Sequence, residues 1–312
     1  MSGGVVLRSA LCSRRAPHTV FPAPVPSTLR YRSRTSAFPP HYGSNASGGE
    51  GEERRRVRAT HLEWVEERLS DRDRAIMSSL AQVRLASGSQ LERLHFTELA
   101  MPSRPVVRRR VLARLVGWHV LTTFERRIGG VRAGSAGLVY ALDTAGHRLI
   151  NTQATTRRPK LPGERFWRHL LDITELYVQL VESQRHGNLA LTAFATEPAC
   201  WWRDSYGVWI KPDAFCKLSS SGVEDAWWVE VDRATESLPT LRRKLLMYVE
   251  FARLGQNGPG GIIPRVLVTV PTQVRKRAVQ GLIDRLPGPA SELMRVVEFE
   301  EATEALKRYL HE

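Results

Sequence analysis

The run Trp228-Val229-Glu230-Val231-Asp232, together with the upstream Lys211-Pro212-Asp213, carries the pattern that decides the fold of the second half of this chain. Asp213 lies in or at the start of a predicted strand, and Glu230 belongs to the next one. Alternation along a strand places Glu230 and Asp232 on one face. The separation of Asp213 and Glu230 leaves room for a hairpin, so the sequence predicts that three carboxylates come together.

The segments around these carboxylates predict a mixed sheet flanked by helices. The expected strands span residues 189–196, 208–217, 226–231, 265–270 and 294–299. Expected helices span residues 166–183, 238–254 and 272–285, with one more at the carboxyl end. A first helix, a hairpin-like set of strands and then crossover helices are typical of an α/β (α+β) domain, here residues 164–312.

The preceding segment, residues 70–150, predicts a winged helix-turn-helix. Its expected elements are helices 71–85, 89–96 and 103–117, a hairpin of strands 120–126 and 138–142, and a short helix at 145–150. Ser70 and Ser103 stand where N-caps are expected, and Pro105 lies in the first turn of the third helix. A polar linker, residues 151–163, joins this segment to the α/β domain.

Charge points to a polyanionic partner. The chain of 312 residues carries 46 Lys and Arg against 32 Asp and Glu, a formal net charge of +14. Such a surplus favours nucleic acid through counterion release, and arginines also occur inside the predicted elements. The alternative is a basic tail that only keeps the protein soluble. Residues 1–69 are expected to be a disordered basic tail, or to follow from a start codon assigned too far upstream, rather than a transit peptide.

Two sets of arginines are candidates for DNA contacts. The third helix presents one set away from its apolar stripe, as a recognition helix does, and the hairpin tip carries the other. The alternative is a solvated basic face. The candidates are Arg104, Arg109 and Arg110 on the helix, and Arg126, Arg127 and Arg132 at the tip.

The three carboxylates are candidate metal ligands. Mg²⁺ or Mn²⁺ held by Asp213, Glu230 and Asp232 would activate water for phosphodiester cleavage, and Lys244 on the following helix would act as an electrophile. In the alternative, the acids are structural, with Asp213 in a turn and Glu230 paired to Arg233 or Arg242, and Lys244 extends to solvent.

Other polar and aromatic residues have structural interpretations that we favour. The acidic face of the helix at 166–183 (Asp172, Glu175, Gln179 and Glu182) is expected to be solvated, although Glu175 could add a ligand. His169 is expected in a core or interface. The paired tryptophans at 201–202 and 227–228 are expected to fill a core rather than to stack bases.

Several function classes are excluded by composition. Three scattered cysteines provide neither a disulfide framework nor a zinc knuckle. No apolar run has the roughly 20 residues of a membrane span. We therefore expect a cytoplasmic protein associated with the nucleoid or a plasmid, with no membrane partner and with an oligomeric state that the sequence does not determine.

Four runs carry a resemblance to a known family. They are Asp71-Arg-Asp-Arg-Ala-Ile-Met77, Leu138-Val-Tyr-Ala-Leu-Asp-Thr-Ala-Gly146, Lys211-Pro-Asp-Ala214 and Glu230-Val-Asp-Arg-Ala-Thr-Glu-Ser237. Together with the arginine-rich third helix, they resemble the replication-relaxation family of actinobacterial plasmids and mobile elements, over about residues 70–285. The last run, followed by a helix rich in Leu, Lys and Tyr, is the most specific.

The resemblance implies a winged-helix domain followed by a restriction-endonuclease-like domain of the PD-(D/E)xK type. Asp213 matches the first acid of that motif and Glu230 the second, whereas Asp232 replaces the lysine, for which Lys244 would substitute. The expected function is binding of double-stranded DNA in replication or DNA maintenance, with metal-dependent cleavage. The alternative is a catalytically inactive DNA-binding regulator that uses the nuclease-like fold as a platform, and a dimeric transcriptional repressor ranks last.

Overall fold

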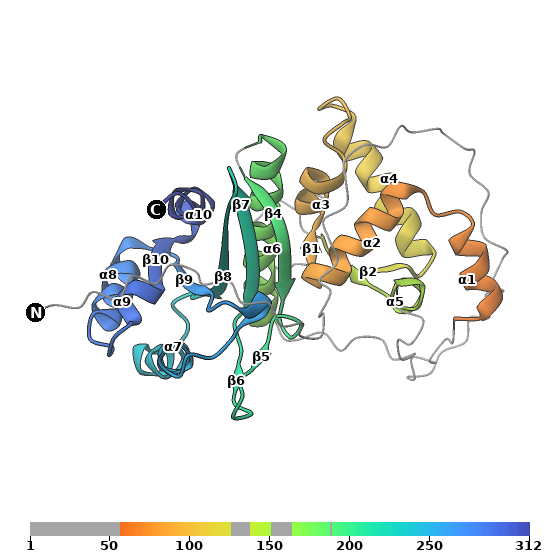
Figure 1. Ribbon diagram of the computed structural model, residues 1–312. Helices are drawn as coiled ribbons and strands as arrows, with labels where there is room; N and C mark the ends of the chain where they lie inside the picture. Colours follow the sequence, from red (N-terminus) through yellow and green to blue (C-terminus); the bar gives the residue numbers. More distant parts are fainter. Residues whose placement is uncertain (1–56, 126–137, 151–163, 188) are drawn as a thin grey trace, which may run out of the picture.

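The computed structural model describes residues 57–125, 138–150, 164–187 and 189–312 (Figure 1). They form two units, which meet along the long helix α6 (Glu164–Arg185). The architecture is mixed α/β, as predicted.

The N-terminal unit contains the three helices and the two hairpin strands that the sequence predicts, in the predicted order. Its elements are α1 (Ala59–Glu66), α2 (Asp71–Val83), β1 (Ala86–Ser87), α3 (Gly88–His95), α4 (Arg104–Gly117), β2 (Leu121–Glu125), β3 (Leu138–Leu142) and α5 (Thr144–Ile150). The short strand β1, which was not predicted, pairs with β3 and gives an antiparallel sheet of order β1-β3-β2.

Helix α1 corrects the predicted disordered tail, which was expected to reach residue 69. Val65 is fully buried, and the Trp64 and Trp118 rings meet edge to face at 5.3 Å. His61 also contacts the carbonyl oxygen of Trp118 at 3.0 Å. These contacts offset the conformational entropy lost when the short helix α1 becomes ordered. The prediction of a disordered tail is therefore wrong for residues 59–66. Residues 1–56 lie outside the described residues.

The two predicted N-caps differ. The Ser70 hydroxyl accepts a hydrogen bond from the Asp73 amide at 3.2 Å, and the Asp73 carboxylate accepts one from the Ser70 amide at 2.9 Å, a capping box. Ser103 makes no side-chain cap, because its own backbone is already helical. Ser103 therefore occupies the predicted N-cap position of α4, but its side chain does not cap the helix.

The C-terminal unit contains a five-stranded mixed sheet of order β10-β9-β8-β7-β4. After α6 come β4 (Ala190–Thr196), β5 (Trp202–Arg203), β6 (Trp209–Ile210), β7 (Ala214–Ser220), β8 (Val223–Val231), α7 (Leu238–Arg253), η2 (Pro259–Gly261), β9 (Arg265–Val270), α8 (Gln273–Ile283), α9 (Ala290–Leu293), β10 (Met294–Glu298), η3 (Phe299–Glu301) and α10 (Ala302–Tyr309). Strands β4, β7 and β8 are antiparallel, and β8, β9 and β10 are parallel.

The predicted strand at 208–217 is divided into two. Its first part, β6, pairs with β5 in a separate hairpin, and its second part, β7, joins the main sheet. Pro212 lies at the division, and a proline has no amide hydrogen for a strand ladder. Asp213 is therefore placed just before β7, at the end of the sheet where this inner strand begins.

Both faces of the main sheet are covered. Trp227 packs in the cluster that continues through α6 into the N-terminal unit, whereas Trp228 packs on the opposite face with Tyr248 and Phe251 of α7. Both tryptophans are fully buried. The prediction that this pair fills a core is confirmed.

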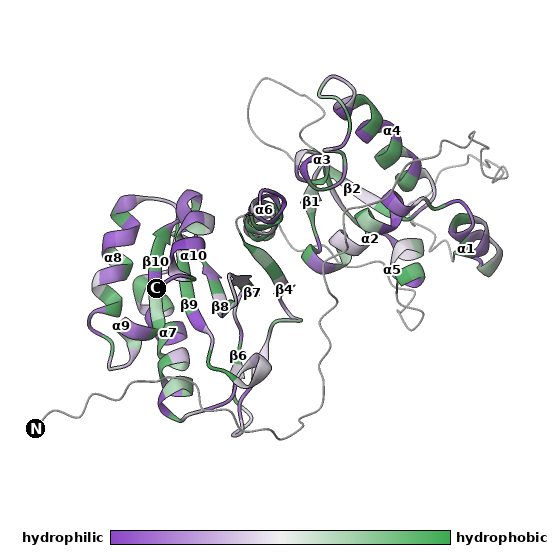
Figure 2. Ribbon diagram, turned by 45° about the horizontal axis from the view of Figure 1, so that its top comes forward, coloured by the Kyte–Doolittle hydropathy of each residue, from purple (hydrophilic) through white to green (hydrophobic). Residues whose placement is uncertain are grey.

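The two units share one apolar core and a set of polar contacts, rather than meeting only at a linker. Figure 2 looks along α6, which lies between the main sheet and the helices of the N-terminal unit. The Thr174 hydroxyl donates to the carbonyl of Leu85 at 2.6 Å, and the Gln82 amide donates to that of Phe194 at 2.8 Å. The position of one unit is thereby tied to that of the other.

Candidate active site

A cavity of about 390 Å³ opens at the edge of the main sheet where Asp213 precedes β7. Five elements bring polar side chains to it. They are His169 from α6, Glu197 after β4, Asp213 before β7, Glu230 near the end of β8 and Lys244 from α7. These five residues are spread over positions 169 to 244, so the cavity forms only when the sheet and its helices pack together.

Lys244 lies between the two carboxylates that the sequence singled out. Its amine is 3.4 Å from Asp213 Oδ1 and forms an ion pair with Glu230 Oε2. The Tyr248 hydroxyl, one helical turn further along α7, donates a hydrogen bond to Glu230 Oε1. The lysine therefore points back to the acids, as one of the two sequence interpretations expected, and does not extend to solvent.

The backbone fixes Asp213 against β8. The Asp213 amide donates to the carbonyl of Val229 at 3.0 Å, and its Oδ2 accepts from the amide of Val231 at 2.7 Å. Register therefore places Asp213 beside Glu230, which is 2 % exposed. The hairpin expected between these two acids is present.

Two further residues join the cavity that the sequence did not assign to it. His169 Nε2 is 3.4 Å from Asp213 Oδ1, although the sequence favoured a core or interface position for this histidine. Glu197 contacts Arg84 of the N-terminal unit at 3.4 Å. His169 shares a helical face with apolar residues of α6, so the sequence pattern predicted a core position and not one in the cavity. Glu197 belongs to no motif that would have singled it out.

The charges in the cavity perturb one another. Burial would raise the pKa of Asp213, but His169 and Lys244 outweigh it and hold this pKa below its usual range. Burial raises the pKa of Glu230 to about 8, against the opposing effect of Lys244. Burial would lower the pKa of His169, and Asp213 reverses this shift. The site thus holds one strongly acidic carboxyl beside one that binds a proton readily.

Asp232 borders the cavity but is engaged elsewhere. Its Oδ2 accepts from Arg275 Nε at 2.6 Å, and its Oδ1 accepts from the amide of Ala234 at 2.8 Å. Since β8 ends at Val231, the alternation that placed Asp232 with Glu230 does not continue. Within the described ranges no group of three His, Cys, Asp or Glu residues could hold a metal ion, so the expected three-carboxylate cluster is not formed.

The remaining donors still suit a divalent cation. Mg²⁺ commonly uses one or two protein carboxylates and completes its shell with water and phosphate oxygens. Asp213 and Glu230 lie on the same cavity and meet at one lysine amine. These two carboxylates would hold the metal, and Asp232 would not.

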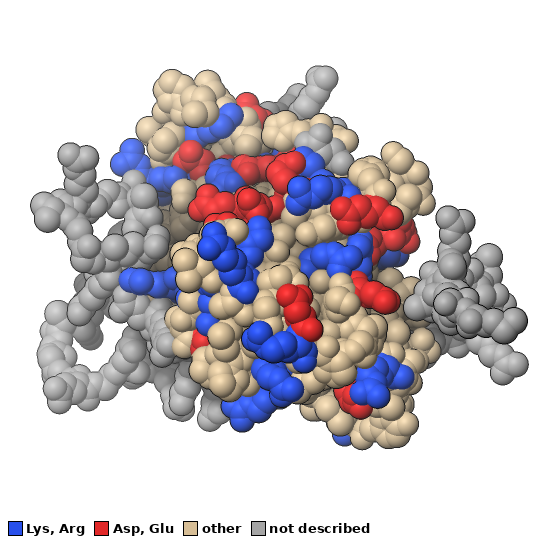
Figure 3. Space-filling model, turned by 90° about the vertical axis from the view of Figure 1, so that its left-hand side faces the viewer, with Lys and Arg blue, Asp and Glu red and all other residues tan. Residues whose placement is uncertain are grey.

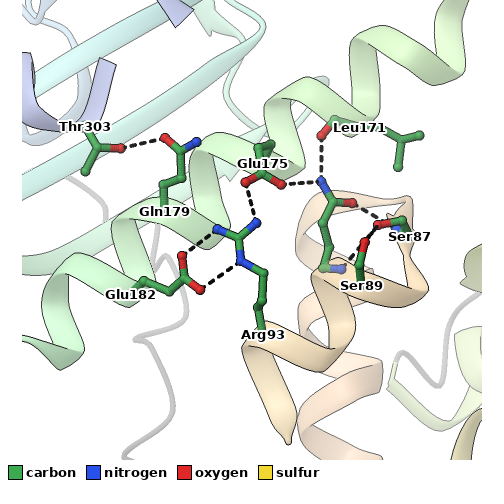
Figure 4. A network of polar contacts seen from close by, with 9 residues as sticks. Ser87, Ser89, Arg93, Leu171, Glu175, Gln179, Glu182 and Thr303 are labelled. Atoms are coloured by element: carbon green, nitrogen blue, oxygen red, sulfur yellow. Dashed lines mark hydrogen bonds and ion pairs between the residues drawn. The ribbon is translucent and has the colours of Figure 1, made fainter. Parts of the chain in front are cut away.

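The acidic face of α6 is paired and not simply solvated, contrary to expectation (Figure 4). Arg93 of α3 donates from Nε to Glu182 at 2.8 Å and from Nη1 to Glu175 at 2.5 Å. Gln179 accepts from Thr303 of α10 at 3.1 Å, and Asp172 pairs with Arg233. Glu175 therefore connects the two units and is no ligand in the cavity.

The arginines predicted to contact DNA have different surroundings. Arg109 and Arg110 are exposed on α4. Arg104 instead donates to the carbonyls of Leu99 at 2.8 Å and Thr97 at 2.7 Å, and so closes the loop before α4. Arg126, Arg127 and Arg132 lie outside the described residues.

The net charge is concentrated in segments outside the described residues, although arginines also occur inside the folded elements, as expected. Residues 1–56, 126–137 and 151–163 hold 15 of the 46 Lys and Arg but 3 of the 32 Asp and Glu. The rest of the chain has 31 basic and 29 acidic residues, a net charge of +2 out of +14. In Figure 3, accordingly, both signs are interspersed over the face that carries α8 and α10.

Comparison with known proteins gives one match. A family model described as replication-relaxation matches residues 77–266. The chain belongs to the replication-relaxation family. The matched range runs from α2 to the start of β9, so the family region includes His169, Asp213, Glu230 and Lys244.

No curated protein and no solved structure matches this member of the replication-relaxation family. Among its described helices, none is long and apolar enough to cross a membrane.

Proposed function

We propose that this replication-relaxation protein binds double-stranded DNA and cleaves phosphodiester bonds with a divalent metal, in the replication or maintenance of a plasmid or mobile element. The observation that carries the proposal is the meeting of Asp213, Glu230 and Lys244 at one cavity, from three separate elements. Two carboxylates can hold a divalent metal that activates water for phosphodiester cleavage, and a lysine beside them adds positive charge for the phosphate.

Each cavity residue has a role in this proposal. Asp213 and Glu230 would hold Mg²⁺ or Mn²⁺, which would supply an activated water and neutralise developing charge. Lys244 places a positive charge where the phosphate would enter, since its amine lies between the two acids. His169 positions Asp213 by contacting Oδ1, and the Val231 amide fixes Oδ2.

The N-terminal unit supports the DNA-binding half of the proposal. Three helices followed by a hairpin, in a β1-β3-β2 sheet, are the element order of winged-helix proteins that bind duplex DNA. Arg109 and Arg110 are exposed on its third core helix, where a recognition helix contacts the major groove. The basic segments at 126–137 and 151–163 add positive charge beside this unit in the sequence.

A plasmid-nicking assay tests the catalytic half. Supercoiled plasmid is incubated with the protein in Mg²⁺ or Mn²⁺, and its topology is followed on a gel beside Asp213→Asn. The wild type is expected to give nicked or linear product, and Asp213→Asn at least a hundredfold less. Asp284→Asn is the matched control, because this aspartate accepts a hydrogen bond from Gln280 at 2.8 Å and does not line the cavity.

The same assay separates the two interpretations of the fold. If wild-type protein retards the plasmid but leaves it supercoiled with either metal, the chain is a DNA-binding regulator on a nuclease-like fold. If it neither retards nor cuts, the proposal fails. Thermal unfolding of all three proteins confirms that loss of product follows from loss of the carboxylate and not from misfolding.

A further inference from the structure

A small hairpin projects from the edge of the main sheet beside the cavity. Its strands, β5 and β6, extend below the sheet in Figure 1, apart from the other strands. Its tip carries large side chains in contact with solvent: Tyr206 is 72 % exposed and Trp209 44 %. The hairpin thus leaves two aromatic side chains, three positions apart in the sequence, accessible to a ligand.

The hairpin holds these rings in a defined position. Asp204 Oδ1 accepts from the amides of Tyr206 at 2.9 Å and Val208 at 2.7 Å, and Gly207 has the positive φ of +86° that the turn requires. The Trp202 indole donates to the carbonyl of Asn257 at 2.9 Å, which ties the base of the hairpin to the body. A ligand would therefore bind to rings that are already ordered.

Cations accompany the aromatic rings. The Arg203 guanidinium lies 5.8 Å from the centre of the Trp209 ring, and the Lys211 amine lies 4.8 Å from that of Trp201. The one acid in residues 201–211 is Asp204, whose Oδ1 is occupied by backbone amides. Aromatic faces interleaved with cations suit bases joined by phosphates better than an apolar partner.

The hairpin is continuous with the cavity. It leaves the sheet just after Glu197 and returns just before Asp213, and both of these acids line the cavity. The Cys200 thiol donates a hydrogen bond to the carbonyl of Pro212 at 3.1 Å, which holds the two ends of the hairpin segment together. Both ends of the hairpin therefore join residues of the cavity, and nucleic acid bound at its base would lie close to Asp213.

We propose that the β5–β6 hairpin binds unpaired bases of DNA by stacking them on Tyr206 and Trp209, while Arg203 and Lys211 contact the neighbouring phosphates. The substrate class is then duplex DNA that carries an unpaired segment at the cavity, such as a fork or a flap. This inference rests on the proposed function in that DNA is the ligand, but it concerns binding and not cleavage.

The test compares a forked duplex with a blunt duplex of the same length by fluorescence anisotropy, in EDTA so that no cleavage occurs. The wild type is expected to bind the fork about tenfold more tightly. The double variant Tyr206→Ala/Trp209→Ala is expected to lose about tenfold on the fork and less than twofold on the blunt duplex, because stacking contributes this much per base. Val274→Ala, an exposed apolar side chain of α8, is the control.

A 2-aminopurine at the first unpaired position reports stacking directly. Its fluorescence is expected to fall on binding to the wild type and not on binding to the double variant. Equal fork binding by the two proteins, or equal losses on fork and blunt duplex, would overturn the inference. A wild-type dimer that the double variant converts to a monomer would make the hairpin an interface between copies, which also overturns it.

The two proposals fail separately. If the wild type nicks plasmid but the hairpin variant binds the fork normally, the cleavage proposal stands and the stacking inference does not. If the fork preference depends on Tyr206 and Trp209 but no nicking occurs, the hairpin binds DNA beside an inactive site. Absence of all DNA binding by the wild type would overturn both.

Discussion

The carboxylates of α6 and the carboxylates at β7 and β8 each meet a cation, but the two regions obtain it from different places. Arg93, which pairs with Glu175 and Glu182, comes from the other unit, and its side chain is 36 % exposed. Lys244, which meets Asp213 and Glu230, comes from α7 of the same unit, and Glu230 beside it is almost fully buried.

The difference shows what each ion pair does. At α6 the charges connect two units across a surface that water still reaches, so the pairing contributes modestly and salt screens it. In the cavity the two carboxylates are largely removed from water, with side chains 11 % and 2 % exposed, and they depend on Lys244, which remains 30 % exposed at the open side. Sequence alone described both regions as clustered acids on one face.

Removal of the cavity lysine should have the largest effect on stability. In Lys244→Met, Asp213 and Glu230 would remain buried beside each other, with His169 still in contact with Asp213 and the Tyr248 hydroxyl still bonded to Glu230. We expect a loss of about 3 kcal/mol in the free energy of unfolding, because an uncompensated buried charge is left behind. Urea unfolding measures it.

The control for this prediction is Lys276→Met, whose ion pair with Glu301 is exposed. It should change the free energy of unfolding by less than about 0.5 kcal/mol. Equal losses in the two variants would show that the cavity charges are as well hydrated as surface charges, and the comparison between the regions would then break down.

Removal of the interface arginine should have a smaller effect. Arg93→Ala deletes the hydrogen bonds to Glu175 and Glu182 that join α3 to α6. We expect a loss of about 1.5 kcal/mol, which reflects charged hydrogen bonds discounted for partial exposure. The loss should shrink in 1 M salt, whereas that of Lys244→Met should not. Arg253→Ala, which breaks an exposed pair with Glu250, is the control.

Acid should lower the free energy of unfolding by less than either of these two substitutions. Burial, together with Arg185 and Arg72, lowers the pKa of His95 at the end of α3 to about 3. Since the unfolded chain takes up this proton near pH 6.5 and the folded protein does not, stability falls as pH drops through 6.5. Between pH 7 and 5.5 the fall should be about 1 kcal/mol.

The variant His95→Asn checks the origin of that fall. It removes the titrating ring while leaving a side chain that can face Ser79, which His95 contacts at 3.0 Å. The pH dependence of its unfolding between pH 7 and 5.5 should be weaker than that of the wild type by about 1 kcal/mol. An unchanged slope would place the acid sensitivity in other groups.

Much of the fold was predictable because it follows from local pattern. The Ser70 cap, the apolar stripes of the helices and the alternation of β8 depend on residues within a few positions of one another. The same holds for the placement of Asp213 and Glu230 on neighbouring strands. Errors occurred where distant contacts decide, as in α1, whose order depends on the packing of Trp64 against Trp118.

The candidate site was predictable in part for the same reason. Two acids and a lysine were found from strand period, helix position and motif, but Asp232 was assigned to them as well. Its partner, Arg275, belongs to α8, and the helix α7 and the strand β9 separate the two residues in the sequence. No rule of local spacing could therefore reveal the pair. His169 and Glu197 reach the cavity by the packing of α6 and the end of β4.

By itself the sequence determined the α/β class, the order of nearly all elements, the family and the position of most of the net charge in residues 1–56, 126–137 and 151–163. Tertiary structure alone decided which acids meet Lys244, which are paired with arginines, and which aromatic residues face solvent beside the cavity. The physical reason is range. Capping and periodicity act between neighbours in the chain, whereas burial and ion pairing depend on which distant elements pack together.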